Sequence, residues 1–361
     1  MKKFGILTVI FIMTMVSVWG QEDTWEVRKH ITGYVATEFN YFDNLKGYDK
    51  NIGVSVAEAG FLFNYQPIKD LKFKVVAVYR PNSSVDQLIN EINAEYKVNN
   101  FLNVKAGRFL TPLSPINTFY YAPVNVSATL PLITNLHQVF PLNMDAISLN
   151  GSIGNDFKFG YDLFAGGYRN SVNMKSGAMG FYGTEADYFE NLEETSFTVD
   201  YESFNTSLNF GGGGHIQASY KDMITVGFNV FKGQKENINI MLPQIGQMFP
   251  EKLQKDVYGF NFNFKHNSLN VVAEWWDNDM TIMGETYDTS DGFVIVSNTF
   301  NKLTPYVRYE QHTAFGSDII RYAAGVNYKP IFETTLKLEY LHYDYNDYDL
   351  NGLVASVIYS F

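Results

Sequence analysis

The sequence contains no cysteine, and charged residues make up only 18% of its 361 positions. The absence of cysteine excludes a disulfide framework and a thiolate metal site. Beyond residue 20 there is no run of the roughly 18 apolar residues that a membrane-spanning helix needs. The formal net charge of −11 opposes binding to nucleic acid, so no nucleic-acid partner is expected.

The one long apolar run lies at the N-terminus. Lys2 and Lys3 precede an apolar stretch that ends at Trp19, and Gly20 offers a cleavage point before Gln21. This order is typical of a secretory signal peptide, so residues 1–20 are expected to be removed. Loss of the two lysines takes the formal charge from −11 to −13 in the mature chain.

Aromatic residues are abundant, with 25 tyrosines and 30 phenylalanines. Many segments of about ten residues alternate apolar and polar positions, which indicates strands with one apolar face. A transmembrane barrel shows this period and places aromatic residues at both lipid–water interfaces. The pattern predicts one all-β domain over residues 21–361, a transmembrane antiparallel β-barrel. The clearest segments are 57–65, 71–80, 157–163, 258–265, 320–328 and 335–340.

The last nine residues, Leu353 to Phe361, place an apolar residue at every second position and end on an aromatic ring. They predict a final strand that faces lipid and closes the sheet. Tight and long connections alternate along the chain, as expected for short periplasmic turns and longer outer loops. Residues 233–254 and 278–290 are predicted to be two of the long connections.

We count 18 strands on this basis, with 16 as the alternative. The least certain strand lies near residues 206–210. It is followed by Gly211–Gly214, which we interpret as a turn or a strand bend. If residues 206–210 form a loop, the count becomes 16, because both ends of the chain must lie in the periplasm.

The segment Leu110–Asn143, after the fifth predicted strand, is rich in proline. Proline removes ladder donors, so this segment is not a strand pair. A long irregular segment in a compact protein is usually functional. We predict a constriction loop that folds into the lumen; the alternative is an outer cap. Its candidate functional residues are Pro112, Pro115, Pro123, Pro131 and His137, and Pro141 is its fifth proline.

The residues Val104-Lys105-Ala106-Gly107-Arg108-Phe109, followed by Thr111-Pro112, resemble the G-R-F…P-F step of the phosphate-selective porin O and P family and related Bacteroidota porins. The chain departs from that step where Leu113-Ser114 replaces the usual Phe-Gly. The resemblance implies a diffusion channel in the outer membrane of a Gram-negative bacterium, in contact with lipid and lipopolysaccharide, and porins of this kind are often homotrimers. It does not imply selectivity for phosphate.

If the apolar faces meet lipid, the opposite faces line the pore. The predicted wall is nearly balanced in charge, and the chain has only six arginines, so we expect a weakly selective pore. The orientation of Arg108 is left open. Under strict alternation Arg108 shares the outward face of Ala106, whereas a bulge at Gly107 would turn it inward. The pore-lining candidates are Lys72, Lys74, Arg80, Glu95, Lys97, Lys105, Arg108, Lys158, Arg308, Glu310, Arg321 and Lys337.

Neither catalysis nor a metal or other cofactor is expected. The six histidines lie on separate segments without metal-ligand spacing, and no G-x-S-x-G motif occurs. The acidic stretch Asp344–Asp349 has oxygen ligands suited to Ca²⁺ but also fits an exposed hairpin loop. The leading hypothesis is a passive porin for small hydrophilic solutes and ions. The alternatives are a non-conducting structural or assembly barrel, or a subunit of a larger outer-membrane complex, and a barrel hydrolase.

Overall fold

The computed structural model describes residues 26–43, 52–80, 88–118, 121–133, 140–168, 198–201, 209–234, 236–242, 247–282, 285–314, 317–345 and 348–361. The predicted signal peptide therefore lies outside the described residues. Within the described ranges, no helix combines the length and the apolar character needed to cross a membrane.

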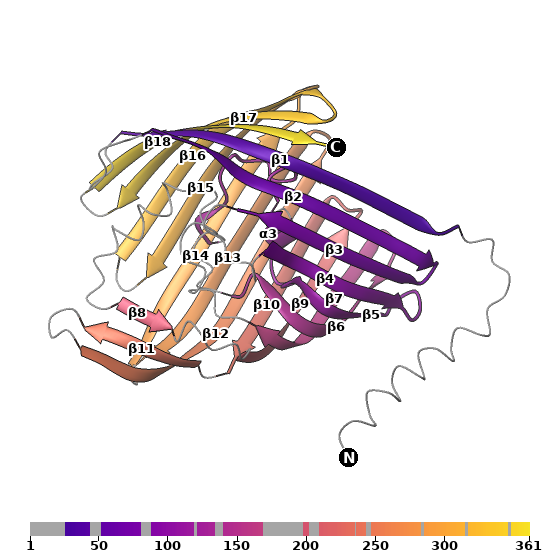
Figure 1. Cartoon of the computed structure of the whole chain (residues 1–361), viewed down its shortest axis with the longest axis horizontal. Helices are drawn as coiled ribbons and strands as arrows, with labels where there is room; N and C mark the ends of the chain where they lie inside the picture. Colours follow the sequence, from indigo (N-terminus) through magenta and orange to yellow (C-terminus); the bar gives the residue numbers. More distant parts are fainter. Residues whose placement is uncertain are drawn as a thin grey trace, which may run out of the picture.

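The described chain is almost entirely β-strand, with one short helix, α3 (Pro115–Thr118). Figure 1 shows the strands side by side around a common interior, with α3 between the walls. The strands are β1 (Arg28–Phe42), β2 (Ile52–Ile68), β3 (Leu71–Tyr79), β4 (Ile89–Lys97), β5 (Asn103–Leu110), β6 (Asn143–Gly154), β7 (Phe157–Tyr168), β8 (Thr198–Tyr201), β9 (Asn209–Tyr220), β10 (Ile224–Gly233), β11 (Glu236–Leu242), β12 (Gln247–His266), β13 (Leu269–Ile282), β14 (Glu285–Asn298), β15 (Leu303–Ala314), β16 (Ser317–Ile331), β17 (Thr334–Tyr345) and β18 (Tyr348–Ser360).

Sixteen of these strands form a closed antiparallel barrel, which confirms the predicted fold class. β7 pairs directly with β9, and β10 pairs with the second half of β12, so β8 and β11 are not part of the wall. They form a small sheet with the first half of β12 instead. The barrel closes where β1 pairs with β18, from Tyr34↔Ser360 to Phe42↔Gly352. The prediction of 18 barrel strands is wrong, and the alternative of 16 is correct.

The glycine run explains part of this error. Of the two alternatives predicted for Gly211–Gly214, the turn is wrong, because these residues lie within β9, between β7 and β10. A Cβ atom on Gly213 would lie 2.2 Å from the carbonyl oxygen of Val230, so only glycine permits this close approach of backbones. Two predicted long connections are also largely strand: 278–290 belongs mostly to β13 and β14, and 233–254 contains β11 and the start of β12.

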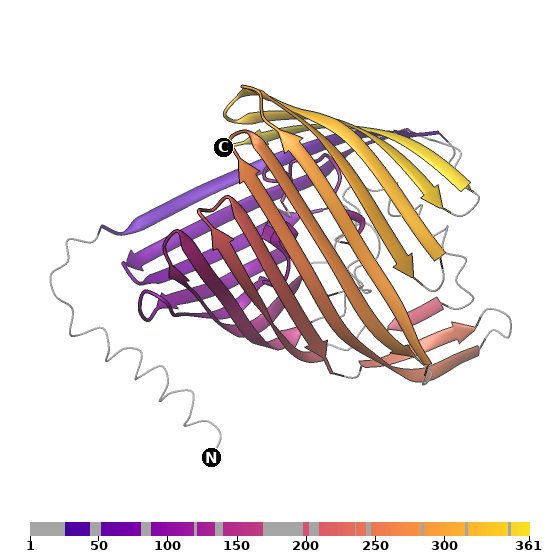
Figure 2. The same ribbon diagram turned by 180° about the vertical axis from the view of Figure 1, so that it is seen from behind.

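Tight turns gather at one end of the barrel, called here the turn end, where β1 begins and β18 ends (Figures 1 and 2). Lys221, Asp222, Asn267 and Asn301 adopt φ between 50° and 58° in three of these turns. Two consecutive residues with positive φ, as at Lys221 and Asp222, match the right-handed twist of the strands that they join. The opposite end, called the loop end, carries the longest connections, including the one from β5 to β6, but the connections that follow β13, β15 and β17 at this end are only two residues long.

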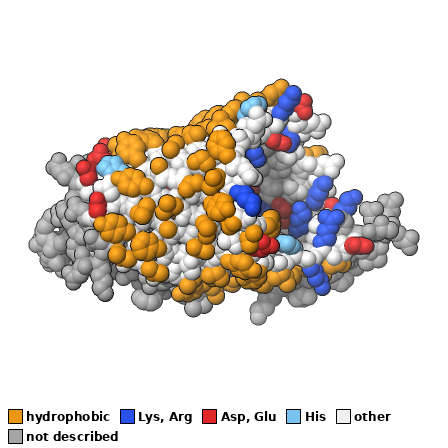
Figure 3. Space-filling view, turned by 90° about the horizontal axis from the view of Figure 1, so that it is seen from above, with side chains coloured by type: hydrophobic (Ala, Val, Ile, Leu, Met, Phe, Trp, Pro, Cys, Tyr) orange, Lys and Arg blue, Asp and Glu red, His pale blue; other side chains and the backbone are white. Residues whose placement is uncertain are grey.

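The barrel wall has an apolar outer face and a polar inner face. On β15, for example, Val307 and Tyr309 are exposed, whereas Arg308 and Glu310 between them are buried. The same alternation on β17 exposes Leu338 and buries polar residues on either side. Figure 3 shows hydrophobic side chains spread over the outer surface, and lysines and arginines gathered around the hollow at the turn end. This is the arrangement expected of strands that face lipid on one side.

Candidate functional site: the inner wall and the β5–β6 segment

The chain between β5 and β6, called here the β5–β6 segment, covers residues 111–142. Its two ends are joined: the Thr111 amide donates to the Leu142 carbonyl at 2.9 Å, and the Thr111 hydroxyl donates to the Pro141 carbonyl at 2.5 Å. The Asn117 amide group in α3 donates to the Thr111 carbonyl at 3.0 Å. The segment therefore leaves and re-enters the wall at one point and forms a closed loop of its own.

The first contact of this segment is with β13. The buried Glu274 carboxylate accepts a hydrogen bond from the Ile116 amide at 2.9 Å and another from the Ser114 hydroxyl. The Trp276 indole nitrogen donates to the same carboxylate at 3.0 Å. The Trp276 ring also packs against Phe140, with ring centroids 4.8 Å apart. Polar and apolar contacts thus fix the beginning and the end of the segment on one strand.

The second contact is with β2 to β4. Glu58 accepts hydrogen bonds from the Ala122 amide at 3.0 Å and from Arg80 Nε at 2.8 Å. Tyr121 donates its hydroxyl proton to Glu91 at 3.0 Å, and Lys74 bonds to the same Glu91 oxygen at 2.8 Å. Burial, and then the nearby Glu91 carboxylate, raise the pKa of Tyr121 well above its usual value. Its hydroxyl therefore remains a donor at neutral pH.

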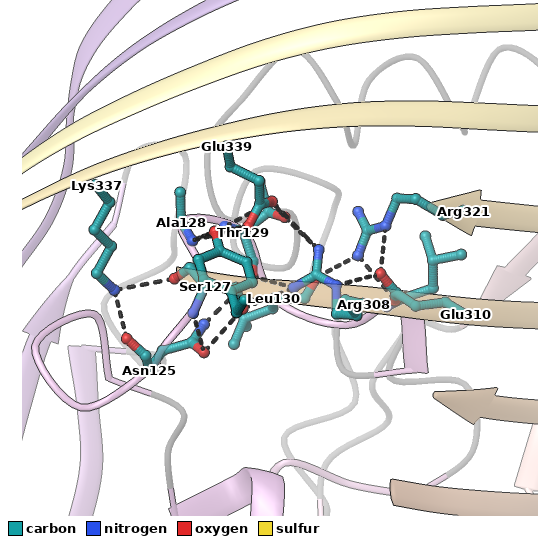
Figure 4. Close-up of polar contacts among 12 residues, drawn as sticks. Asn125, Ser127, Ala128, Thr129, Leu130, Arg308, Glu310, Arg321, Lys337 and Glu339 are labelled. Carbon is teal, nitrogen blue, oxygen red and sulfur yellow. Dashed lines mark hydrogen bonds and ion pairs between the residues drawn. The ribbon is translucent and has the colours of Figure 1, made fainter. Parts of the chain in front are cut away.

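The third contact, with β15 to β17, is the most extensive (Figure 4). Arg308 donates from Nη1 to the Ser127 hydroxyl and to the Thr129 carbonyl, both at 2.7 Å. Its Nη2 donates to the Thr129 hydroxyl at 2.7 Å and to Glu339 at 3.3 Å. Glu339 in turn accepts the Ala128 amide at 3.0 Å. Arg308 and Glu339 therefore bind adjacent groups of the segment as a pair.

A second pair lies beside the first. Arg321 donates from Nε and Nη2 to the two Glu310 oxygens, at 2.7 and 3.0 Å. Glu310 is also 2.5 Å from Arg308 Nε and accepts the Leu132 amide at 2.6 Å. Arg321 donates to the Leu130 carbonyl as well. The three charged side chains are fully buried.

Lys337 completes this side of the site. Its ammonium donates to three backbone carbonyls of the segment, those of Ala122, Asn125 and Ser127, at 2.9, 2.6 and 3.0 Å. An ammonium has three donor protons, so these carbonyls satisfy it completely. Buried charges are costly unless they are paired and hydrogen-bonded. Around β15 to β17 the segment supplies the hydrogen bonds that make the buried wall charges tolerable.

Apart from Arg108, the predicted pore-lining residues fall into four groups. Arg80, Arg308, Glu310, Arg321 and Lys337 take part in the contacts to the β5–β6 segment described above. Lys72, Lys74, Glu95 and Lys105 line a cavity of about 440 Å³ at the turn end. Lys97 lines a second cavity of about 710 Å³, together with Pro112 and Pro115. Lys158 lies outside both cavities, at the rim, and bonds to Asp222 at 2.9 Å.

Arg108 lies on the outer face. It is paired with Ile92 on β4 and with Asp145 on β6, and no register shift occurs at Gly107 although its φ is 120°. Its guanidinium makes two bonds to the Asp145 carboxylate, at 2.6 and 2.9 Å. Of the two orientations predicted for Arg108, the structure therefore shows the outward one, and Arg108 does not belong among the pore-lining residues.

Among the loop residues, Pro131 is buried, Pro123 is half-buried, and His137 lies outside the described residues. Glu91 was not predicted from the sequence, although it lies four residues from Glu95 on β4, and this even spacing places both side chains on the inner face. Tyr34, which donates to Glu58, and Tyr121 were not predicted either. No pattern in the sequence identifies the wall partners of Tyr121, because they depend on the path of the segment.

This architecture is similar to that of several solved structures. No family model matches the sequence, and no curated protein matches it. Among solved structures, OmpT of Vibrio cholerae in its trimer form has a TM-score of 0.61 at 12% identity, covering 93% of this chain and 100% of that one. An anion-selective porin from Comamonas acidovorans gives 0.63 at 11% identity (93% and 100%), and the channel DcaP of Acinetobacter baumannii gives 0.56 at 13% (95% and 99%).

These likenesses define the class of fold: the chain has the fold of the outer-membrane porins. At such low identities the comparison shows the fold alone. It does not place the chain in the porin O and P family, which the short motif around Gly107 resembles.

Proposed function

We propose that this protein is a porin of the outer membrane of a Gram-negative bacterium, through which small hydrophilic solutes and ions diffuse with weak selectivity. The β5–β6 segment folds into the lumen and sets its narrowest point. One observation carries the proposal: inner-wall side chains from β2, β13, β15 and β17 all make hydrogen bonds to this segment, from Ser114 to Leu132.

The width of the barrel supports a water-filled passage. Barrels of about 16 strands leave an aqueous channel unless something fills it. The two cavities of about 440 and 710 Å³ lie between the turn end and the segment and are lined mainly by polar side chains. Polar linings of this kind hold water and hydrated solutes. The apolar outer face of the wall fits contact with lipid, including the acyl chains of lipopolysaccharide.

Weak selectivity follows from the way the wall charges are paired. Arg80 is bonded to Glu58, and Lys74 to Glu91, so much of the charge is neutralised locally. Within the described part of the chain Lys72 and Lys97 make no ion pair, and they tip the balance modestly towards anions. A homotrimer is the proposed assembly, because one structural neighbour is described in trimer form.

Planar-bilayer recordings test the function. The purified protein should give stepwise, ohmic channels in KCl with a mild preference for one ion. Excision of residues 112–132, with Thr111 rejoined to Ile133 by a short glycine linker, should raise the single-channel conductance. An excision of equal length from residues 171–191 serves as the control. A folded 112–132 excision variant with unchanged conductance would show that the segment does not constrict the pore.

A non-conducting structural barrel is the second candidate, and one observation favours it. Most of the described segment is buried, with Leu113, Ser127 and Leu130 all at 0% exposure, so the segment is packed as tightly as a plug. Absence of any conductance from well-folded protein would support this alternative over the porin. We propose no catalytic activity. If hydrolase activity is found, the buried pair of His312 and Asp291 on the inner wall is the first candidate for the catalytic site.

A further inference from the structure

The two cavities described above have linings of different chemistry, and each is called here one side of the site. The side formed by β1 to β5, around the cavity of about 440 Å³, is basic. Lys74 is neutralised by Glu91, but Lys72 and Lys105 have no ion pair among the described residues, and Lys105 lies 5.1 Å from the Phe109 ring. Four basic and two acidic side chains line this cavity: Arg28, Lys72, Lys74 and Lys105 against Glu91 and Glu95.

The side formed by β4 to β12 is rich in amides and nearly neutral. It carries one lysine, Lys97, and one carboxylate, Asp162. The remaining polar side chains on this side are Asn100, Asn103, Ser114, Asn150, Ser152, Tyr161, His215, Gln217, Thr225, Asn261 and Asn263. A wall intended only to pass small ions needs no such concentration of carboxamide groups.

Hydrogen bonds hold several of these amides in fixed orientations. Asn103 donates to Asn150 at 3.0 Å, and Asn150 donates to Glu95 at 3.3 Å, which links the amide side to the basic side. Asn229 donates to Asn261 at 3.1 Å deeper in the same wall. Groups that are oriented in advance lose little conformational freedom when a solute binds.

The two sides are close enough to act on one molecule. Asn103 and Lys105 are two residues apart on the same face of β5, a separation of about 7 Å along a strand. The cavities, about 440 and 710 Å³, are in the size range of small-molecule sites. A solute with an anionic group and a chain of hydroxyls could therefore reach both.

We propose that this part of the pore is a binding site for anionic polyhydroxylated solutes of the sugar-acid class. The carboxylate lies against Lys72 and Lys105, and the hydroxyls bond to the amides on β5, β6 and β12. Carboxamides both donate and accept, so they match hydroxyls in either role. A small inorganic anion would leave the amides unused, and a neutral sugar would leave the lysines unused. This inference rests on the proposed porin function.

Three probe solutes separate these cases in planar bilayers: gluconate, glucose and acetate. We expect a saturable block of the KCl current, with half-saturation by gluconate at a concentration about tenfold below that for glucose or acetate, the equivalent of one net hydrogen bond to a charged group. Lys72→Gln with Lys105→Gln should remove the advantage of gluconate over glucose. Asn103→Ala with Asn263→Ala should weaken gluconate and glucose but not acetate.

Lys158→Gln is the matched control, because Lys158 lies at the rim and lines neither cavity. All variants should keep the heat-modifiable mobility of a folded barrel. Equal half-saturation for the three probes in a conducting channel would overturn the inference and leave the porin function intact. If the protein does not conduct, calorimetric titration with gluconate decides separately: binding that depends on Lys72 and Lys105 preserves the site, and no binding overturns it.

Discussion

Replacement of Lys337 by methionine should loosen the β5–β6 segment. The ammonium of Lys337 makes three hydrogen bonds to carbonyls of the segment and is almost fully buried. A hydrogen bond to a charged group contributes a net ~1.5–3 kcal/mol, and the three bonds share one ammonium, so their effects do not add. We expect a loss of about 3–5 kcal/mol in the free energy of unfolding, because three buried carbonyls lose their donor and each unsatisfied group costs about 1–3 kcal/mol.

Lys265→Met is the matched control, since it makes the same chemical change at an exposed position on β12. Its effect should stay within about 0.5 kcal/mol, as for most surface substitutions. Urea titration of both variants in detergent micelles gives the free energies, and the Lys337 variant should also show greater current noise in bilayers. If the two variants are equally stable and equally quiet, Lys337 does not hold the segment and the reasoning from the three carbonyls is wrong.

Two further predictions concern the wall. Gly213→Ala should reduce the yield of folded barrel, because its Cβ would meet the rigid Val230 carbonyl at 2.2 Å; Gly214→Ala should be milder, since its Cβ meets the movable end of a leucine side chain at 2.8 Å. Heat-modifiability on gels measures both, and equal yields would contradict the prediction. Deletion of Phe361 should impair assembly in the outer membrane, because its backbone exchanges two 2.9 Å hydrogen bonds with Gly33 where the barrel closes. Normal yield of the truncated protein in outer-membrane fractions would refute this.

The fold class could be predicted because each strand of a membrane barrel alternates apolar residues that face lipid with polar residues that face the interior. On β15 and β17 the apolar side chains of Val307, Tyr309 and Leu338 are exposed, whereas the neighbouring polar side chains of Arg308, Glu310, Lys337 and Glu339 are buried. The number of strands could not be predicted in the same way. β9 contains a glycine run that resembles a turn, and β11, within the predicted connection 233–254, is a strand that pairs outside the barrel with β8 and the start of β12.

The predictions for single residues also depended on local alternation. The sequence placed Arg308, Glu310, Arg321 and Lys337 on the inner face, because the face of a strand residue depends only on local alternation. It left Arg108 open, because a single glycine decides whether alternation continues; the pairing of β5 with both neighbours settles that question.

The sequence by itself determined the alternation of the strands, the apolar outer surface, the polar inner wall, and the irregular proline-rich character of residues 110–143. The tertiary structure alone decided which strands close the barrel and which wall charges meet the β5–β6 segment. The physical reason is distance along the chain. The bonds from Glu58 to Ala122 and from Lys337 to Asn125 join residues 64 and 212 positions apart, and no local pattern encodes such a pairing.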